Sequence, residues 1–386
     1  MTNKSFTIKE ILSDHWDDFL SLGYNLRPAI TKNVIKVINC GDPSFGHSLY
    51  YCDHCNKFKY VPFRCKSRFC NTCGATYVDE RAKSISFKLI KCNHRHLVFT
   101  IPEELRMFFR RDRSLLNLLF EASKLTILSW FRSIKKSERF TPGFISTLHT
   151  FGRDLKWNPH IHMILTLGAS GINTPWRSFN HIPFAMLRRR WQTILLELFH
   201  KKLGTSFYSI KTKLFYTYTK GFYVYAKYND KPFTQNYVDY IVRYSGKPAM
   251  AQSRILDYDG KYVTFYYDRH EDGKRVVEKL DAVQFIKRLI IHIPDEQFKM
   301  VRYYGLYAKK YKHSSKLFLL VSREKKNFII RHSNWRARHL ISFGIDPLKC
   351  QCGNTMELFE VFMPSHPSKP PPSLDYIPPP SYNISC

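Results

Sequence analysis

FISTLHTFGRDLKWNPHIHMILTLG, residues 144–168, contains two largely apolar stretches joined by a short polar loop. Each stretch has the length and composition of a β-strand. Side chains alternate between the two faces of a strand, so His160 and His162 share one face and Ile161 lies on the other. Apolar residues follow Ile161 at every second position. The pattern therefore predicts a strand with a core face and a face that carries imidazoles.

A third imidazole belongs to the preceding strand. An antiparallel return would bring His149 beside the His-x-His pair, and a site of three histidines would leave coordination positions for water or phosphate oxygens. The alternative is that these histidines are structural. A second pair, His94 and His96, encloses Arg95, which is a poor core residue. We expect that pair at a frayed strand start.

The remaining pattern predicts an α+β fold, because helices and strands do not alternate regularly. Helices are predicted over residues 6–22, 77–90, 103–135 (one helix or two), 184–204, 234–248 and 281–293. Strands are predicted over 96–101 and 222–228, and a hairpin with an Asp-Gly turn over 255–269. Residues 40–75 are expected to be irregular, and the proline-rich tail from 364 disordered.

Charge is the strongest compositional signal. The chain of 386 residues has 61 Lys and Arg against 31 Asp and Glu, a net charge of +30. Such an excess favours a polyanionic partner, and the 16% aromatic content suits single-stranded nucleic acid, where bases stack and phosphates pair. The first residues lack the apolar stretch of a secretory signal, and no apolar run is long enough for a membrane span. We expect a cytoplasmic protein that does not bind membranes.

Close-spaced cysteines in a reducing compartment indicate metal more often than disulfides. Cys52-x-x-Cys55 and Cys70-x-x-Cys73 each form a knuckle, and two knuckles complete a tetrahedral thiolate site for structural Zn²⁺. A closed site has no open position, so we expect no catalysis there. The many Lys and Arg residues around the cysteines predict contact with a DNA backbone.

The other cysteines are less informative. Cys65 and His47 could replace a knuckle ligand or belong to a second ion. Cys350 and Cys352 form half a site, and we interpret them as surface thiols. No pattern is readable at Cys40, Cys92 and Cys386.

Two tyrosines are candidates for covalent chemistry. Tyr240 and Tyr244 lie four residues apart on one face of a predicted helix, with Tyr237 on the same face. Packing into a core would explain such a stripe. A phenol is also a nucleophile that can hold phosphate, provided that a cation or base nearby offsets its pKa of roughly 10.

Together these motifs carry a resemblance. A cysteine-knuckle module, then LHTFGRDLKWNPHIHMIL, then YIVRYSGKPAMAQSRI, resembles the two-tyrosine transposases of bacterial insertion sequences that move by a rolling-circle-like route. These enzymes belong to the HUH endonuclease superfamily, with relaxases, rolling-circle replication initiators and Helitron transposases. The resemblance covers roughly residues 20–310. It implies an antiparallel sheet flanked by helices, preceded by a small zinc-knuckle domain.

The resemblance also implies a mechanism. His160 and His162 would be the HUH ligands of Mg²⁺ or Mn²⁺, with His149 at the upstream third-ligand position. Tyr240 and Tyr244 would be the paired nucleophiles that cut single-stranded DNA and keep its 5′ end as a phosphotyrosine. A bacterial, nucleoid-associated transposase is then expected. A relaxase or replication initiator, or a zinc protein that binds DNA without catalysis, is the alternative.

Four regions follow from this interpretation. They are a helical and zinc-binding region that binds DNA (1–90), the nuclease domain (91–310), a basic C-terminal region (311–363) and the disordered tail (364–386).

Overall fold

A six-stranded sheet carries the strands around the histidines in this computed structural model, which confirms the α+β class. The structure describes residues 6–135, 137–179, 181–225, 249–269, 272–309, 319–331 and 334–364. The strand order is β11-β4-β5-β3-β7, and β6 pairs with β5. Their bounds are β3 (His94–Phe99), β4 (Thr141–Phe151), β5 (Trp157–Ser170), β6 (Arg177–Ser178), β7 (Val224–Tyr225) and β11 (Val301–Gly305).

The antiparallel pairing of β4 with β5 sets which side chains share a face. Thr147 lies opposite His162, and His149 lies opposite His160. Ile161 on the other face is completely buried, as are Met163 and Leu165 further along β5. The predicted alternation is therefore confirmed, and the imidazoles project from a strand that is anchored by its opposite face.

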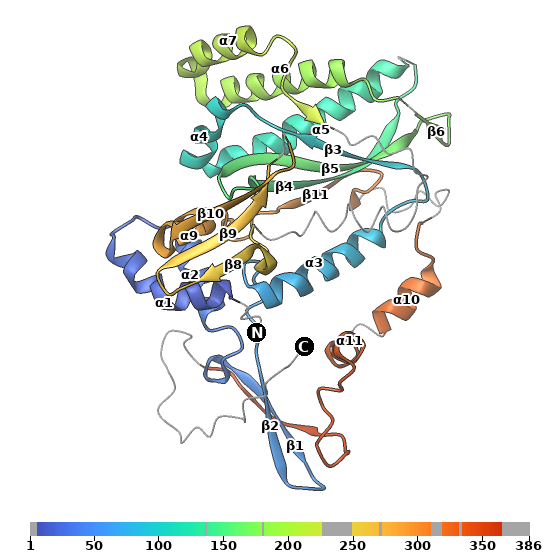
Figure 1. Cartoon of the computed structure of the whole chain (residues 1–386). Coiled ribbons are helices and arrows are strands. Elements are labelled where there is room, and N and C mark those ends of the chain that lie inside the picture. Colours follow the sequence, from blue (N-terminus) through green and yellow to red (C-terminus); the bar gives the residue numbers. More distant parts are fainter. Residues whose placement is uncertain are drawn as a thin grey trace.

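Helices cover that buried face. Figure 1 shows them gathered on one side of the six-stranded sheet; they are α4 (Glu103–Arg111), α5 (Leu116–Ile134), α6 (Phe184–Leu203) and α7 (Tyr208–Thr217). Their apolar faces and the sheet form the largest core cluster. The helix pattern predicted over 103–135 is two helices. They separate at Asp112, whose carboxylate accepts a hydrogen bond from the Ser114 amide at 2.9 Å and caps a short 3₁₀ turn.

The face that carries the imidazoles is covered in part by α3 (Asn71–Ser86), which lies on the opposite side of the sheet from α5 and α6 (Figure 1). Ile85 at its end and Leu89 just beyond it pack against Ile145 and Ile164 of the sheet. This cover leaves His160 and His162 half-buried. The part of β3 predicted to fray is a regular strand, because His94–Phe99 pairs along its whole length with Ile161–Thr166.

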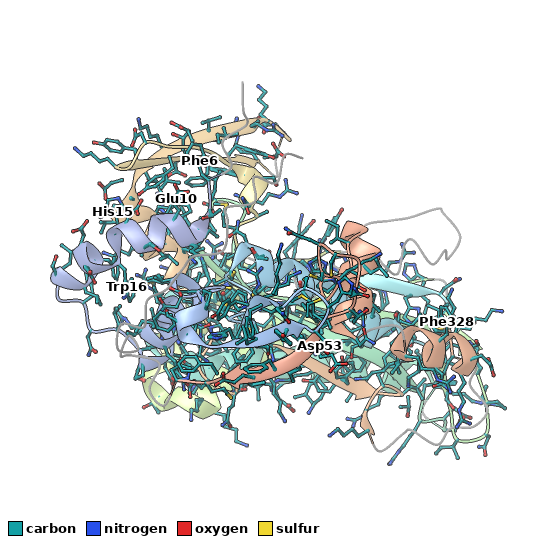
Figure 2. All side chains as sticks on the ribbon, turned by 90° about the horizontal axis from the view of Figure 1, so that it is seen from below. Phe6, Glu10, His15, Trp16, Asp53 and Phe328 are labelled. Atoms are coloured by element: carbon teal, nitrogen blue, oxygen red, sulfur yellow. The ribbon has the colours of Figure 1, made fainter. Side chains whose placement is uncertain are left out.

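A second core lies beside the sheet. It joins the amino-terminal helices to a three-stranded sheet and the helix that follows it: α1 (Ile8–Ser21), α2 (Pro28–Ile38), β8 (Ile255–Tyr258), β9 (Tyr262–Asp268), β10 (Arg275–Asp281) and α9 (Ala282–Ile290). Thr7 caps α1 by accepting a hydrogen bond from the main-chain amide of Glu10 at 3.0 Å. Phe6 and His15 lie beside the hairpin of β8 and β9 (Figure 2), where both rings contact Tyr258.

A hairpin after α2 and the last described strand meet in a further sheet. β1 (His47–Cys52) pairs with β2 (Lys57–Pro62) on one side and with β12 (Glu357–Phe362) on the other. Residues 40–75 are therefore not irregular throughout. The strands were hard to predict because they are stabilised by pairing with a segment that is distant in the sequence. Before β12 lie α10 (Arg323–Arg331) and α11 (Trp335–Phe343). No described helix is long and apolar enough to span a membrane.

Candidate functional site

The histidines predicted on the two central strands lie together. The nearest ligand nitrogens of His149, His160 and His162 are all within 4.8 Å of one another. Nε2 of His160 is 3.0 Å from Nε2 of His162, and the ring of His149 is centred 4.3 Å from that of His162. Two nitrogens at about 2.1 Å from one cation, at right angles, are separated by roughly 3.0 Å. The spacing therefore fits two ligands of one ion.

Hydrogen bonds identify which nitrogen of His160 can bind a cation. Its Nδ1 lies 2.7 Å from the carbonyl oxygen of Asn158, which can only accept, so Nδ1 carries the proton. Burial, together with the nearby charge of Arg106, lowers the pKa of His160 to about 4. The ring is therefore neutral at pH 7 and presents the lone pair of Nε2 toward His162.

A fourth histidine, His96, supports this cluster, although its sequence pattern predicted only a frayed strand start. Nε2 of His96 lies 2.8 Å from Nδ1 of His162. The two rings are nearly parallel, at 8°, with centroids 5.0 Å apart, so the contact is an in-plane hydrogen bond. Burial, and the nearness of His160, lower the pKa of His96 to about 4, so that its Nε2 can accept. His96 of β3 pairs with Ile164 of β5, so it lies diagonally across from His162. This proximity depends on strand pairing and cannot be read from the spacing of residues within one strand.

The prediction that the two C-x-x-C knuckles share one zinc ion is wrong. The structure separates Cys52 and Cys55 from Cys70 and Cys73, and places each pair in a different cluster of thiols. The reason is the β1–β2 hairpin, which carries Cys52 and Cys55 away from the start of α3.

The first cluster consists of Cys40, Cys65, Cys70 and Cys73. The sulfur of Cys40 lies 3.6 Å from that of Cys73 and 3.7 Å from that of Cys70. In a tetrahedral site with Zn–S of about 2.3 Å the sulfurs are roughly 3.8 Å apart. Cys65, predicted as an extra ligand, is thus a member, and so is Cys40, for which no pattern was readable.

The second cluster consists of Cys52, Cys55, Cys350 and Cys352. The interpretation as surface thiols is wrong for Cys350, which is buried with its sulfur 3.3 Å from that of Cys55. Cys352 is exposed, as expected, but its sulfur lies 3.5 Å from that of Cys52. His47 belongs to neither cluster. Its Nδ1 is 2.8 Å from the carbonyl oxygen of Pro43, and its ring contacts Tyr60 and Phe362.

The predicted nucleophiles, Tyr240 and Tyr244, lie outside the described residues, together with the helix predicted over 234–248. The described chain reaches Tyr225 at the edge strand β7 and continues at Ala249. Ala249 is buried in the same cluster as Leu155, which lies in the turn between β4 and β5.

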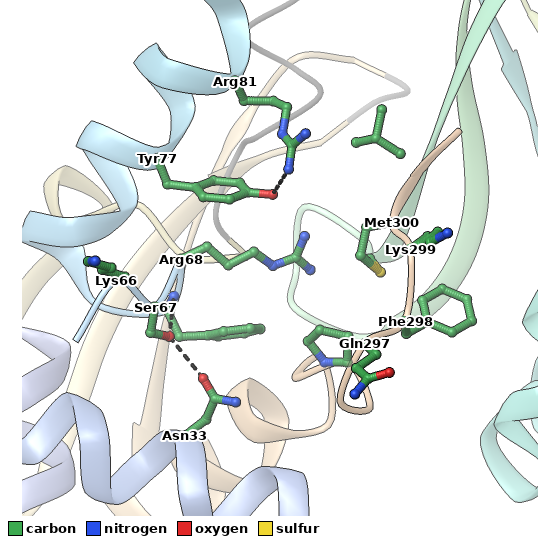
Figure 3. Close-up of a pocket in the computed structure, with 13 residues that line it drawn as sticks. Asn33, Lys66, Ser67, Arg68, Tyr77, Arg81, Gln297, Phe298, Lys299 and Met300 are labelled. Carbon is green, nitrogen blue, oxygen red and sulfur yellow. Dashed lines mark hydrogen bonds between the residues drawn. The ribbon is translucent and has the colours of Figure 1, made fainter. Parts of the chain in front are cut away.

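A basic pocket of about 450 Å³ opens between the zinc-knuckle region and the sheet. Figure 3 shows the guanidinium groups of Arg68 and Arg81 directed into it, and Lys66 and Lys299 also line it. Among the described residues that form its walls there is no Asp or Glu. Burial lowers the pKa of Arg68, the expected effect where a cation has left water without a carboxylate beside it.

The pocket and the histidines share one face of the sheet. Val301, in the pocket wall, pairs with Thr147, which in turn pairs with His162. Directly opposed residues of antiparallel strands point to the same side, so these side chains lie in a row across three strands.

Two parts of the chain match known protein families. Residues 143–315, which contain the histidines of β4 and β5, match a family described as a putative transposase. Residues 11–101, which contain the first cysteine cluster, match the transposase zinc-binding domain. The chain thus carries a transposase zinc-binding domain followed by a transposase domain.

Curated relatives agree with that assignment. The transposase is 27% identical over 313 residues to the transposase for insertion sequence element IS801 of Pseudomonas savastanoi pv. phaseolicola, which covers 76% of this chain and 74% of the relative. It is 26% identical over 330 residues to putative transposase y4qJ of Sinorhizobium fredii (strain NBRC 101917 / NGR234), covering 79% and 81%. No solved structure matches this transposase significantly.

Proposed function

We propose that this transposase cuts and rejoins single-stranded DNA through a covalent 5′-phosphotyrosine and thereby moves an insertion sequence by a rolling-circle-like route. The observation that carries the proposal is the cluster of three imidazoles on β4 and β5, on the sheet face that also bears the basic pocket. A protein that only binds DNA has no need of ligand nitrogens converging beside a phosphate-binding surface.

His149, His160 and His162 are the proposed ligands of a divalent cation. Three imidazoles favour a first-row transition ion, so Mn²⁺ suits this donor set better than Mg²⁺, which prefers oxygen ligands. When bound, the cation would polarise the scissile phosphate and stabilise the charge that develops on it. The protein's own contribution is to hold the imidazoles neutral and in register on paired strands.

Tyr240 and Tyr244 are the proposed nucleophiles. Tyr244 precedes Ala249 by five residues, and five residues span at most about 18 Å. The described chain resumes at Ala249, which is buried in the second core, and Leu155, in the turn where β4 leads into β5, belongs to the same core. His149 and His160 lie near that end of their strands.

The proposed reaction is a reversible exchange of phosphodiester bonds. The phenol oxygen of one tyrosine attacks phosphorus, its proton is lost, and the bond from phosphorus to the 3′ oxygen of the preceding nucleotide breaks. The leaving oxygen takes up a proton and becomes a 3′-OH. A 3′-OH attacks the phosphotyrosine in the reverse direction, so the strand is rejoined without ATP. The second tyrosine allows a second strand to be held.

The flanking features would position the DNA. Zn²⁺ in the cluster of Cys40, Cys65, Cys70 and Cys73 would fix the loop that carries Lys66 and Arg68, because these residues lie between two of its ligands. The basic pocket would then bind a backbone phosphate next to the histidines.

The test is formation of a covalent adduct with a single-stranded oligonucleotide that carries the element end, resolved on a denaturing gel. We expect an adduct with Mn²⁺, none with EDTA, and none from the double variant Tyr240→Phe and Tyr244→Phe. His160→Ala should also abolish it, since one of the proposed ligands is lost.

Tyr216→Phe is the matched control. It makes the same chemical change at a tyrosine that is 80% exposed on α7, away from the sheet. It should form the adduct normally. An adduct that persists in the double tyrosine variant would contradict the assignment of the nucleophiles. Metal-dependent DNA binding with no adduct under any condition would favour the non-catalytic alternative.

A further inference from the structure

The second thiol cluster joins the two ends of the described chain. Cys52 ends β1 and Cys55 lies in the turn of the β1–β2 hairpin, and Cys350 and Cys352 lie about 300 residues later, just before β12. Sulfur atoms approach across this gap in two pairs: Cys52 to Cys352 at 3.5 Å, and Cys55 to Cys350 at 3.3 Å. All four sulfurs are within 4.8 Å of one another.

These distances fit a shared metal ion and exclude disulfides. A disulfide needs its sulfurs at about 2.05 Å, whereas the edges of a tetrahedral Zn–S₄ site measure roughly 3.8 Å. The side-chain amide of Asn354 donates a hydrogen bond to the sulfur of Cys352 at 3.6 Å. Cysteine binds metal as the thiolate, and a donor beside the sulfur favours that form.

We propose that Cys52, Cys55, Cys350 and Cys352 bind a second structural Zn²⁺, which fastens the C-terminal strand β12 to the amino-terminal hairpin. This site is separate from the zinc of the first cluster. It lies partly outside residues 11–101, the range that matches the zinc-binding domain, because two of its ligands are at the other end of the chain.

Weak packing of β12 explains why a metal is needed. Leu358, Phe359 and Val361 are 56%, 62% and 48% exposed, so the strand gains little from apolar burial. Its register with β1 also shifts between Leu49 and Tyr50, which interrupts the ladder of hydrogen bonds. Bringing together segments so distant in the chain costs loop-closure entropy, and metal–thiolate bonds can offset that cost.

Other contacts position the C-terminal segment that carries Cys350 and Cys352. Arg336 of α11 forms a bidentate ion pair with Asp346, with N–O distances of 2.8 and 2.6 Å. Lys59 of β2 donates a hydrogen bond to the carbonyl oxygen of Pro347 at 2.7 Å. The Cys350 amide bonds to the Asn354 carbonyl at 2.8 Å, closing the knuckle. The segment is therefore shaped and docked at the hairpin by contacts other than the sulfurs.

The test counts thiolate-bound metal in the full chain. Reduced protein is titrated with Co²⁺, and sulfur-to-cobalt charge-transfer absorption reports only ions bound by cysteine, so an ion held by the histidines does not contribute. We expect two thiolate-bound ions per chain in the wild type, and one in the double variant Cys350→Ser and Cys352→Ser. Cys92→Ser, which changes a thiol outside both clusters, should keep two.

A second readout follows β12 itself. Hydrogen exchange of the β1 and β12 amides should accelerate in the double variant, while exchange in β4 and β5 stays unchanged. One thiolate-bound ion in the wild type, or disulfides among these four cysteines in non-reduced protein, would overturn the proposal. Loss of both ions from the double variant would overturn the claim that the sites are separate. Neither readout depends on DNA cleavage, so failure of the proposed reaction leaves this test intact.

Discussion

At the scale of single residues, His96 lies outside the proposed set of metal ligands but can position one of them. Nδ1 of His162 must keep its proton when Nε2 binds a cation, and that proton needs an acceptor in a buried place. Nε2 of His96 supplies it at 2.8 Å. In the same way, the carbonyl oxygen of Asn158 accepts the Nδ1 proton of His160. Each ring is thus held in the tautomer that offers Nε2.

Replacing His96 should weaken the cation site without removing a ligand. In His96→Ala the Nδ1 proton of His162 loses its acceptor, and we expect Mn²⁺ affinity to fall roughly 10- to 100-fold, the usual effect of such partners. Mn²⁺ binding is measured by electron paramagnetic resonance of the free ion, independently of cleavage. His96→Gln, whose amide oxygen can accept, should recover part of the affinity.

The control for this change is His181→Ala, an exposed imidazole outside the cluster, which should bind Mn²⁺ normally. Unchanged affinity in His96→Ala would show that the hydrogen bond does not position His162.

At the scale of elements, the basic pocket is a product of three segments. The loop before α3 provides Arg68, α3 itself provides Arg81, and the segment leading into β11 provides Lys299. Arg81 is held by a hydrogen bond from its guanidinium to the Tyr77 hydroxyl at 3.1 Å. Cations from separate elements converge on one space, which is the arrangement expected for a backbone phosphate.

Removing one of these charges should reduce DNA affinity in a salt-dependent way. For Arg68→Gln we expect weaker binding of a single-stranded oligonucleotide and a slope of log K against log salt smaller by about 0.7, the value for one phosphate contact. Fluorescence anisotropy at several salt concentrations measures both quantities.

Arg64→Gln removes the same charge from an exposed residue of the same loop that is not part of the pocket wall. The two variants should therefore differ. Equal salt slopes for both would mean that the pocket contributes only to the general field of a basic protein.

At the scale of the whole molecule, His292 connects the two cores. Its Nδ1 lies 3.1 Å from the Thr150 hydroxyl of β4, and its Nε2 lies 2.9 Å from the carbonyl oxygen of Leu155, a member of the second core. Its ring stacks on Trp157 of the first core at an interplanar angle of 7°. Burial lowers the pKa of His292 to about 3, with further lowering by Arg113 and Arg68.

This depressed pKa predicts loss of stability in mild acid. Below about pH 6.5 this imidazole is protonated in the unfolded chain, whereas in the folded chain it stays neutral down to about pH 3. The free energy of unfolding therefore falls by roughly 1.4 kcal/mol for each unit by which the pH is lowered. Between about pH 6.5 and pH 5 His292 accounts for about 2 kcal/mol. Urea unfolding at both pH values measures this change. In His292→Gln the free energy of unfolding should fall by about 2 kcal/mol less between pH 6.5 and pH 5 than in the wild type.

The exposed His181 provides the comparison, because His181→Gln should retain the wild-type loss between the two pH values. If His292→Gln loses as much stability as the wild type over this range, protonation of the other buried histidines dominates.

Local pattern was sufficient for much of the fold. Alternation along β5 predicted its buried face, and the Asp-Gly turn placed the β8–β9 hairpin. These features depend on neighbours close in sequence. Whether residues 103–135 form one helix or two was left open, because the cap at Asp112 decides it. The strands on either side of the first knuckle were missed, because pairing with another strand stabilises them.

By itself, the sequence determined that His160 and His162 share a face, and that two C-x-x-C pairs are available for metal, because both follow from spacing within one segment. Only the tertiary structure decided which thiols meet, that His96 bonds to His162, and that cations from three elements form one pocket. The physical reason is that ligand geometry acts over a few ångströms in space, whereas the partners lie tens to hundreds of residues apart along the chain.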